Sequence, residues 1–160
     1  MGAILDANVA HEVFGGCNRP EAGRRFFNQI NRGEGILVAG GKLLKELLST
    51  SVRRNIDEAF RSGKIKRIND RKIDALTKKL QDQGGFKSND PHVLVLAQVS
   101  GARLLYSNDG DLQKDFGNKE LVDRPRGKVY STKHGGGKFQ RSHKILLLEL
   151  KNGDLCGSPQ

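Results

Sequence analysis

Acidic residues stand at points of this chain where a parallel α/β fold would gather them. Asp6 and Asp109 are expected at strand ends, and Asp90 at the start of a helix. Glu46 lies on an expected helix just after a strand, and Asp111 follows close behind Asp109. Mg²⁺ and Mn²⁺ prefer carboxylate oxygens, and such an ion can activate water against a phosphodiester. The pattern therefore predicts a catalytic site with Mg²⁺ or Mn²⁺ as its cofactor.

Away from these acids the chain is strongly cationic, with a net charge of +10. The segment 124–144 carries +7 of that charge and holds no acid, and it also contains Tyr130 and Phe139, which can stack on bases. We therefore expect it to bind nucleic acid, although a solvated loop or a surface for an acidic partner protein would have the same composition. The expected contacts are Lys133, Lys138, Arg141 and Lys144.

Each acid also has a structural explanation. Asp90 precedes Pro91 and is well placed to cap a helix, and Asp6 and Asp109 are suited to caps or turns. Glu46 would make only a surface ion pair, worth about 0.3–0.5 kcal/mol. Capping does not explain Glu46, nor why the caps should gather at one sheet edge. Clustered carboxylates raise one another's pKa unless a cation neutralises them, which favours the metal site.

Short apolar runs alternate with helical patterns along most of the chain. Strands are expected at 3–5, 36–39, 65–68 and 104–106, and helices at 20–32, 43–48, 56–60, 73–84 and 90–101, with a short helix after residue 109. This alternation predicts a three-layer α/β/α domain around a mainly parallel sheet. Ligands of such sheets bind beyond the carboxyl ends of the strands.

The length of 160 residues fits one domain. Residues 1–121 are expected to form the domain that carries the acids. Residues 122–160 are expected to be a basic, Gly-rich excursion followed by an apolar run, Ile145–Leu150, that packs on the same domain. That run is too short to be typed as helix or strand from its periodicity.

The remaining composition narrows the setting. No apolar run approaches the ~18 residues of a membrane span, and Asp6 interrupts the first apolar stretch, so no signal peptide is predicted. Cys17 and Cys156 are interpreted as free thiols in a reducing cytoplasm, which is the predicted location. The histidines argue against a zinc site because they are scattered: His11, His92, His134 and His143.

Four segments resemble, in order and spacing, the signature blocks of the PIN-domain nucleases. They are Ile4–Asn8, Lys42–Leu47, Ser88–Leu94 and Leu105–Leu112, and the resemblance covers Gly2 to Phe116. It implies a compact PIN-like α/β/α domain that cleaves single-stranded or structured RNA with Mg²⁺ or Mn²⁺.

The resemblance also assigns roles by position. Asp6, Glu46, Asp90 and Asp109 match the acidic metal site, and Asp111 matches a more variable further acid. The supporting polar positions, which place the acids or the phosphate, are Asn8, Ser107 and Asn108. Many small members resemble VapC-type toxins, so the partner hypotheses include an antitoxin and a homodimer besides RNA. The basic Gly-rich segment is less typical of that toxin subgroup.

The leading prediction is a metal-dependent endoribonuclease. Two alternatives stay open: a non-catalytic nucleic-acid-binding PIN module, and a structure-specific DNA nuclease of related fold. A phosphatase of the haloacid dehalogenase kind is disfavoured, because its chemistry needs a second Asp two residues after Asp6, where this chain has Asn8.

Overall fold

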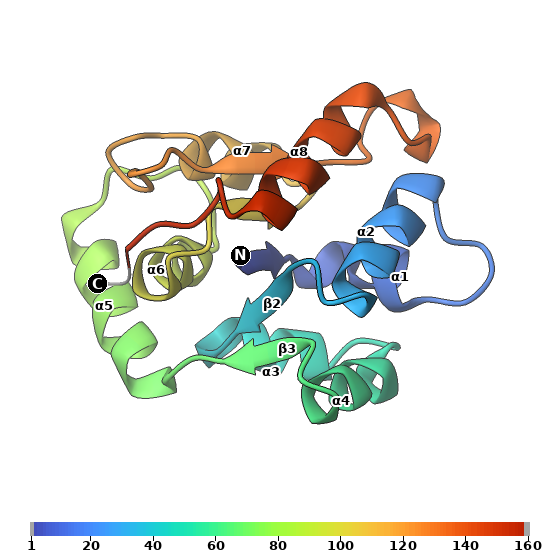
Figure 1. Ribbon diagram of the computed structural model, residues 1–160. Coiled ribbons are helices and arrows are strands. Elements are labelled where there is room, and N and C mark those ends of the chain that lie inside the picture. Colours follow the sequence, from blue (N-terminus) through green and yellow to red (C-terminus); the bar gives the residue numbers. More distant parts are fainter. Residues whose placement is uncertain (1, 159–160) are drawn as a thin grey trace.

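The computed structural model describes residues 2–158 and is built on a five-stranded, all-parallel sheet (Figure 1). The strand order is β3-β2-β1-β4-β5. The strands are β1 (Gly2–Leu5), β2 (Ile36–Ala39), β3 (Ile65–Arg67), β4 (Leu104–Tyr106) and β5 (Lys128–Tyr130). The predicted α/β fold with a parallel sheet is confirmed.

Helices flank the sheet. They are α1 (Ala10–Phe14), α2 (Glu21–Asn31), α3 (Gly41–Leu48), α4 (Arg53–Arg61), α5 (Asp70–Gln83), α6 (Pro91–Ser100), α7 (Gly110–Phe116) and α8 (Arg141–Asn152), with short 3-10 turns η1 (Ala7–Val9) and η2 (Gly135–Gly137). Figure 1 shows α5 and α6 on one side of the sheet and α1 and α2 on the other, with α8 near α2.

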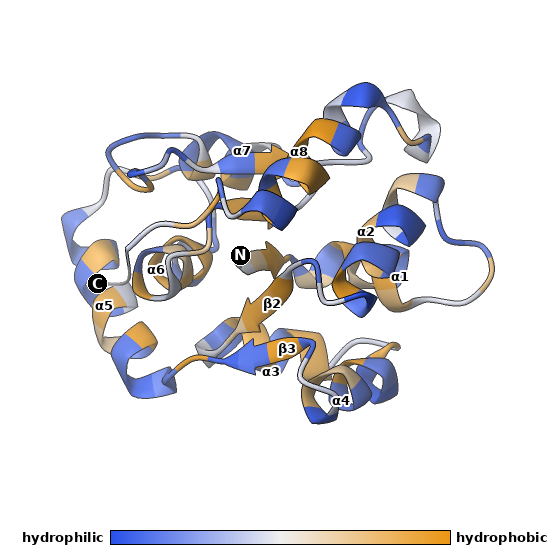
Figure 2. Cartoon of the chain, viewed as in Figure 1, coloured by the Kyte–Doolittle hydropathy of each residue, from blue (hydrophilic) through white to orange (hydrophobic). Residues whose placement is uncertain are grey.

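The central elements are apolar because both of their sides are covered. All three residues of β4 and the first seven residues of α6 are buried. Figure 2 shows β2 and α6 in the colours of apolar residues, whereas much of α4 and α5 is hydrophilic. A parallel strand or helix buried in this way has a continuous apolar run rather than an amphipathic pattern.

The segment after residue 121 differs from the expected irregular excursion, because it contains β5 and the first turn of α8. β5 pairs with β4 over its three residues. The apolar run Ile145–Leu150, which the sequence did not assign to a helix or a strand, lies within α8. The Gln29 amide on α2 donates to the Leu147 carbonyl on α8 at 2.6 Å. Residues 122–158 therefore complete the same fold.

An aromatic cluster shows how deeply this segment is integrated. The rings of Phe26, Tyr106 and Tyr130 lie with centroids 4.8–5.3 Å apart, and Tyr130 is fully buried. Tyr130 therefore packs in the core, and the expectation that it stacks on bases is wrong. Phe139 contacts His143 and the Arg25 guanidinium, so its ring also has partners within the protein.

Within residues 2–158, no helix is both long and apolar enough to cross a membrane. Cys17 and Cys156 are free and exposed, as expected.

Candidate metal centre

The parallel register of β1 and β4 brings Asp6 and Ser107 together. Leu5 pairs with Tyr106, so the next residue of each strand lies at the same edge of the sheet. The Ser107 hydroxyl donates to Oδ2 of Asp6 at 2.8 Å and accepts the backbone N–H of Asp109 at 3.1 Å. One serine side chain thus links the ends of the two strands.

Asp6 lies in a site that disfavours its negative charge. Burial raises the pKa of Asp6, and the nearby carboxylates of Asp90 and Asp109 raise it further, while the Ser107 hydrogen bond opposes them. Asp6 is therefore close enough to two acids distant in the sequence, Asp90 and Asp109, to be repelled by both.

Asp90 occupies the N-cap position of α6, but its side chain makes no capping hydrogen bond. The loop before it is held from another helix. The Asp115 carboxylate on α7 accepts the backbone N–H groups of Lys87 at 2.9 Å and of Ser88 at 2.7 Å. The carboxylate of Asp90 is left available, and the loop that delivers it is tied to the helix that Asp109 begins.

Asp109 does cap its helix. Its Oδ1 accepts the backbone N–H groups of Asp111 at 3.0 Å and Leu112 at 3.3 Å. Asp111 is exposed, and it contacts Asp109 through its backbone rather than through its carboxylate. Asp109 therefore has a structural role, which leaves its Oδ2 for a second one.

Glu46 reaches the site on α3, which starts from a tight glycine turn. Gly41 has a φ of 57°, in the left-handed region, and a Cβ at Gly40 would lie 2.6 Å from the Ile68 carbonyl oxygen. The Gly41 N–H donates to Asp70 at 2.8 Å. Side chains would strain this turn, so the two glycines fix where α3 begins.

Glu46, Asp90 and His92 form a group that could hold a metal ion. One ligand atom from each lies within 4.8 Å of the others. Nε2 of His92 lies 2.8 Å from Oε1 of Glu46, close enough for Glu46 to act on the pKa of His92, but both atoms are buried and neither meets the directional criterion of a hydrogen bond. A buried polar atom left unsatisfied costs about 1–3 kcal/mol, and a cation between these atoms would remove that cost.

Burial lowers the pKa of His92, although Glu46 and Asp90 oppose that shift. The neutral imidazole, which is the metal-binding form, is therefore favoured. Sequence reasoning missed His92 because it looked for spaced pairs of histidines. The sequence did contain a signal for His92. It is a polar residue two positions after the candidate ligand Asp90, in a helix that is otherwise almost entirely apolar.

Asp90 connects the two halves of the site. It lies near Asp6, and it also belongs to the group with Glu46 and His92. The four predicted acids thus converge on one end of the sheet, and they were predicted from separate segments of the chain.

The predicted supporting residue Asn108 has a different role. Its Nδ2 donates to Oγ1 of Thr132 at 2.9 Å, and its Oδ1 accepts from the Ser131 hydroxyl at 2.8 Å. Asn108 therefore holds the segment before Lys133, whose ammonium lies beside Gly110, 3.4 Å from where a Cβ would stand. Asn8 is exposed. Lys133 is therefore placed beside the start of α7.

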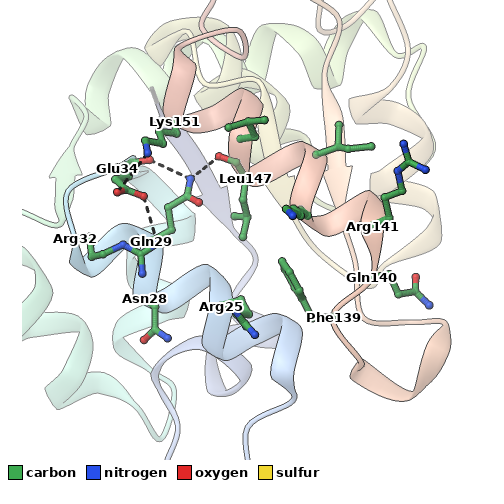
Figure 3. Close-up of a pocket in the computed structure, with 13 residues that line it drawn as sticks. Arg25, Asn28, Gln29, Arg32, Glu34, Phe139, Gln140, Arg141, Leu147 and Lys151 are labelled. Atoms are coloured by element: carbon green, nitrogen blue, oxygen red, sulfur yellow. Dashed lines mark hydrogen bonds and ion pairs between the residues drawn. The ribbon is translucent and has the colours of Figure 1, made fainter.

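The other predicted nucleic-acid contacts, Lys138, Arg141 and Lys144, are exposed. Arg141 and Lys144 line an open surface cavity of about 940 Å³ between α2 and α8, together with other cationic side chains (Figure 3). These are Arg25, Arg32 and Lys151. The acid in the lining, Glu34, is paired with Arg32 at 3.3 Å and Lys151 at 3.7 Å. The cavity therefore combines a cationic rim with an apolar lining, which includes Phe139 and the exposed side chains of Ile145 and Leu148.

Comparison with known proteins adds no assignment, because no family model, curated protein or solved structure gave a significant match to this chain.

Proposed function

We propose that this protein is a divalent-metal-dependent endoribonuclease of the PIN-domain kind. The observation that carries the proposal is the convergence of Asp6, Glu46, Asp90 and Asp109 at the carboxyl end of a parallel sheet, in a chain of net charge +10. Such a charge pattern suits a polyanionic substrate, since the cations bind phosphates and the carboxylates hold the metal.

The protein residues would divide the work as follows. Glu46, Asp90, Asp6 and Asp109 would hold Mg²⁺ or Mn²⁺, which when bound polarises a phosphoryl oxygen and activates water. Ser107 keeps the Asp6 carboxylate oriented through its 2.8 Å hydrogen bond. Burial raises the pKa of Asp6 because it penalises the negative charge of the carboxylate. A bound cation would compensate that charge, so the site favours one.

The RNA would be held by exposed cations. Lys133, beside Gly110, is near enough to the start of α7 to contact a phosphate close to the metal. Arg141 and Lys144 belong to the cationic cavity between α2 and α8, which would bind phosphates farther along the strand. Phosphate contacts position a strand without reading its sequence.

The test is a cleavage assay with end-labelled single-stranded RNA and with DNA of the same sequence. The purified protein is incubated with Mg²⁺, Mn²⁺ or EDTA. We expect internal cuts in RNA with either ion and none with EDTA. The matched variants are Asp90→Asn, which removes a metal ligand, and Asp82→Asn, which changes an exposed acid on α5.

The outcomes separate the alternatives. RNA binding without cleavage under any ion would favour a non-catalytic binding module. Faster cleavage of DNA would favour the DNA nuclease. Equal loss of activity in Asp90→Asn and Asp82→Asn would mean that the lost rate reflects general charge and not the metal site.

A further inference from the structure

His92 is the one side chain of the metal-binding group that the four acidic positions do not include. It lies on the second residue of α6, and its side chain is only 4% exposed. Its Nε2 is buried, has no hydrogen-bond partner, and lies 2.8 Å from an equally unpartnered oxygen of Glu46. A buried nitrogen is thus directed into an acidic cluster.

The separation of the three ligand atoms suits one ion. Metal–ligand bonds of about 2.0–2.2 Å keep any two ligands of one ion within about 4.4 Å of each other. The atoms of Glu46, Asp90 and His92 lie within 4.8 Å, so small side-chain rotations would close them around a cation. Asp115 holds the loop before Asp90 through two backbone N–H groups, so the start of α6 stays in place while the side chains rotate.

The simpler explanation is a structural hydrogen bond between His92 and Glu46. The 2.8 Å separation permits such a bond, and it would act to raise the pKa of His92, but neither atom meets the directional criterion for a hydrogen-bond partner. Two ligands of one ion face the ion instead of each other, and they lie at this kind of separation without a shared proton. A shared ion therefore accounts for this contact, and it also accounts for the approach of the Asp90 carboxylate to the same two atoms.

We propose that Nε2 of His92 ligates the metal together with Glu46 and Asp90, and that this mixed nitrogen–oxygen site takes Mn²⁺ in preference to Mg²⁺. Mg²⁺ is a hard ion that keeps oxygen ligands and waters, whereas Mn²⁺ accepts an imidazole more readily than Mg²⁺ does, although it binds nitrogen least strongly of the first-row transition ions. The inference rests on the proposed metal-dependent function and names the ion of that same site.

The direct test is pulsed electron paramagnetic resonance of the intact protein loaded with one equivalent of Mn²⁺. A coordinated imidazole couples its nitrogen nucleus to the Mn²⁺ electrons and modulates the spin echo. We expect a nitrogen modulation in the wild type that changes when the histidines are labelled with ¹⁵N. It should disappear in His92→Gln and persist in His11→Gln, a control at an exposed position of α1.

Calorimetric titration with Mn²⁺ and Mg²⁺ measures the preference. The wild type should bind Mn²⁺ more tightly than Mg²⁺, and His92→Gln should weaken Mn²⁺ binding by roughly tenfold or more, the loss that even outer-shell changes cause. Mg²⁺ binding should change less, so the ratio of the two affinities should fall. His11→Gln should leave both affinities unchanged.

The outcomes of these measurements test the role of His92 separately from the RNA cleavage activity. Bound Mn²⁺ without nitrogen modulation in the wild type would overturn the role of His92, even if RNA is cleaved and even if His92→Gln does not fold. Nitrogen-ligated Mn²⁺ in a protein that cuts no RNA would uphold the ligand and refute the proposed function. Failure of the wild type to bind Mn²⁺ would refute both.

Discussion

Replacing Asp90 should remove activity while leaving stability nearly intact. Asp90 stands where a helix cap is expected, but its side chain makes no capping hydrogen bond. Asp90→Ala should therefore change the free energy of unfolding by no more than about 0.5 kcal/mol, as for an ordinary surface substitution. The Asp90→Asn variant should behave in the same way.

The expected loss of activity is much larger. A bound metal stabilises the transition state by several kcal/mol. If removing one ligand forfeits about 3–4 kcal/mol of that, the rate falls roughly 10²–10³-fold, at about 1.4 kcal/mol for each tenfold change. The assay is single-turnover cleavage of labelled RNA in saturating Mn²⁺, with urea unfolding measured on the same preparations.

Asp109 provides the contrasting control. Its carboxylate accepts two backbone N–H groups at the start of α7, so Asp109→Ala should cost about 1 kcal/mol of stability in addition to its effect on the rate. An Asp90→Ala protein that loses as much stability as Asp109→Ala would contradict the geometry on which this reasoning rests. Full activity of Asp90→Asn would refute the role of Asp90 as a metal ligand.

Three further predictions concern charge. Since burial raises the pKa of Asp6 in the folded protein, its ionisation costs stability as pH rises through that pKa. Asp6→Asn should therefore stabilise the metal-free protein at pH 7 but not at pH 3 in urea unfolding, and it should abolish cleavage. Mn²⁺ at about 100 times its dissociation constant should stabilise the wild type by roughly 2.7 kcal/mol, reversibly with EDTA; a melting curve indifferent to Mn²⁺ would count against a preformed site. Removing RNA-binding cations should reduce the salt slope of RNA affinity by about 0.7 for each phosphate that is no longer neutralised, and it should change the saturated rate much less. The variant replaces four residues by Ala: Lys133, Lys138, Arg141 and Lys144. Replacing Arg53, Arg54 and Arg61 on α4 is the control, and coincident salt lines for the two variants would mean that the basic segment binds something other than RNA.

The first four strands and the convergence of the acids were predictable because their signals are local. Short apolar runs that end in an acid or a serine mark the central strands, and parallel strands must end at a common edge. The neighbourhood of Asp6 and Ser107 follows from that rule alone, since both residues come directly after a strand.

Other features depend on contacts that a local pattern does not contain. β5 is three residues long and lies in a basic, Gly-rich segment, so its pairing with β4 is what defines it. The type and position of Asp90 suit a helix cap, but in the structure its side chain makes no capping hydrogen bond. The approach of His92 to Glu46 joins two helices whose relative placement no local periodicity describes.

The anchoring of residues 87 and 88 by Asp115 means that the chain segments bearing Asp90 and Asp109 are mechanically joined. Asp115 lies on α7, and Asp109 is the N-cap of the same helix. The Asp115 carboxylate holds the loop that leads into α6. A thermal fluctuation of α7 would therefore carry both segments with it, and the spacing of the two acids would be conserved during the motion. A substitution at the buried Asp115 would release this loop and change the spacing of Asp90 and Asp109, although Asp115 is not itself one of the converging acids.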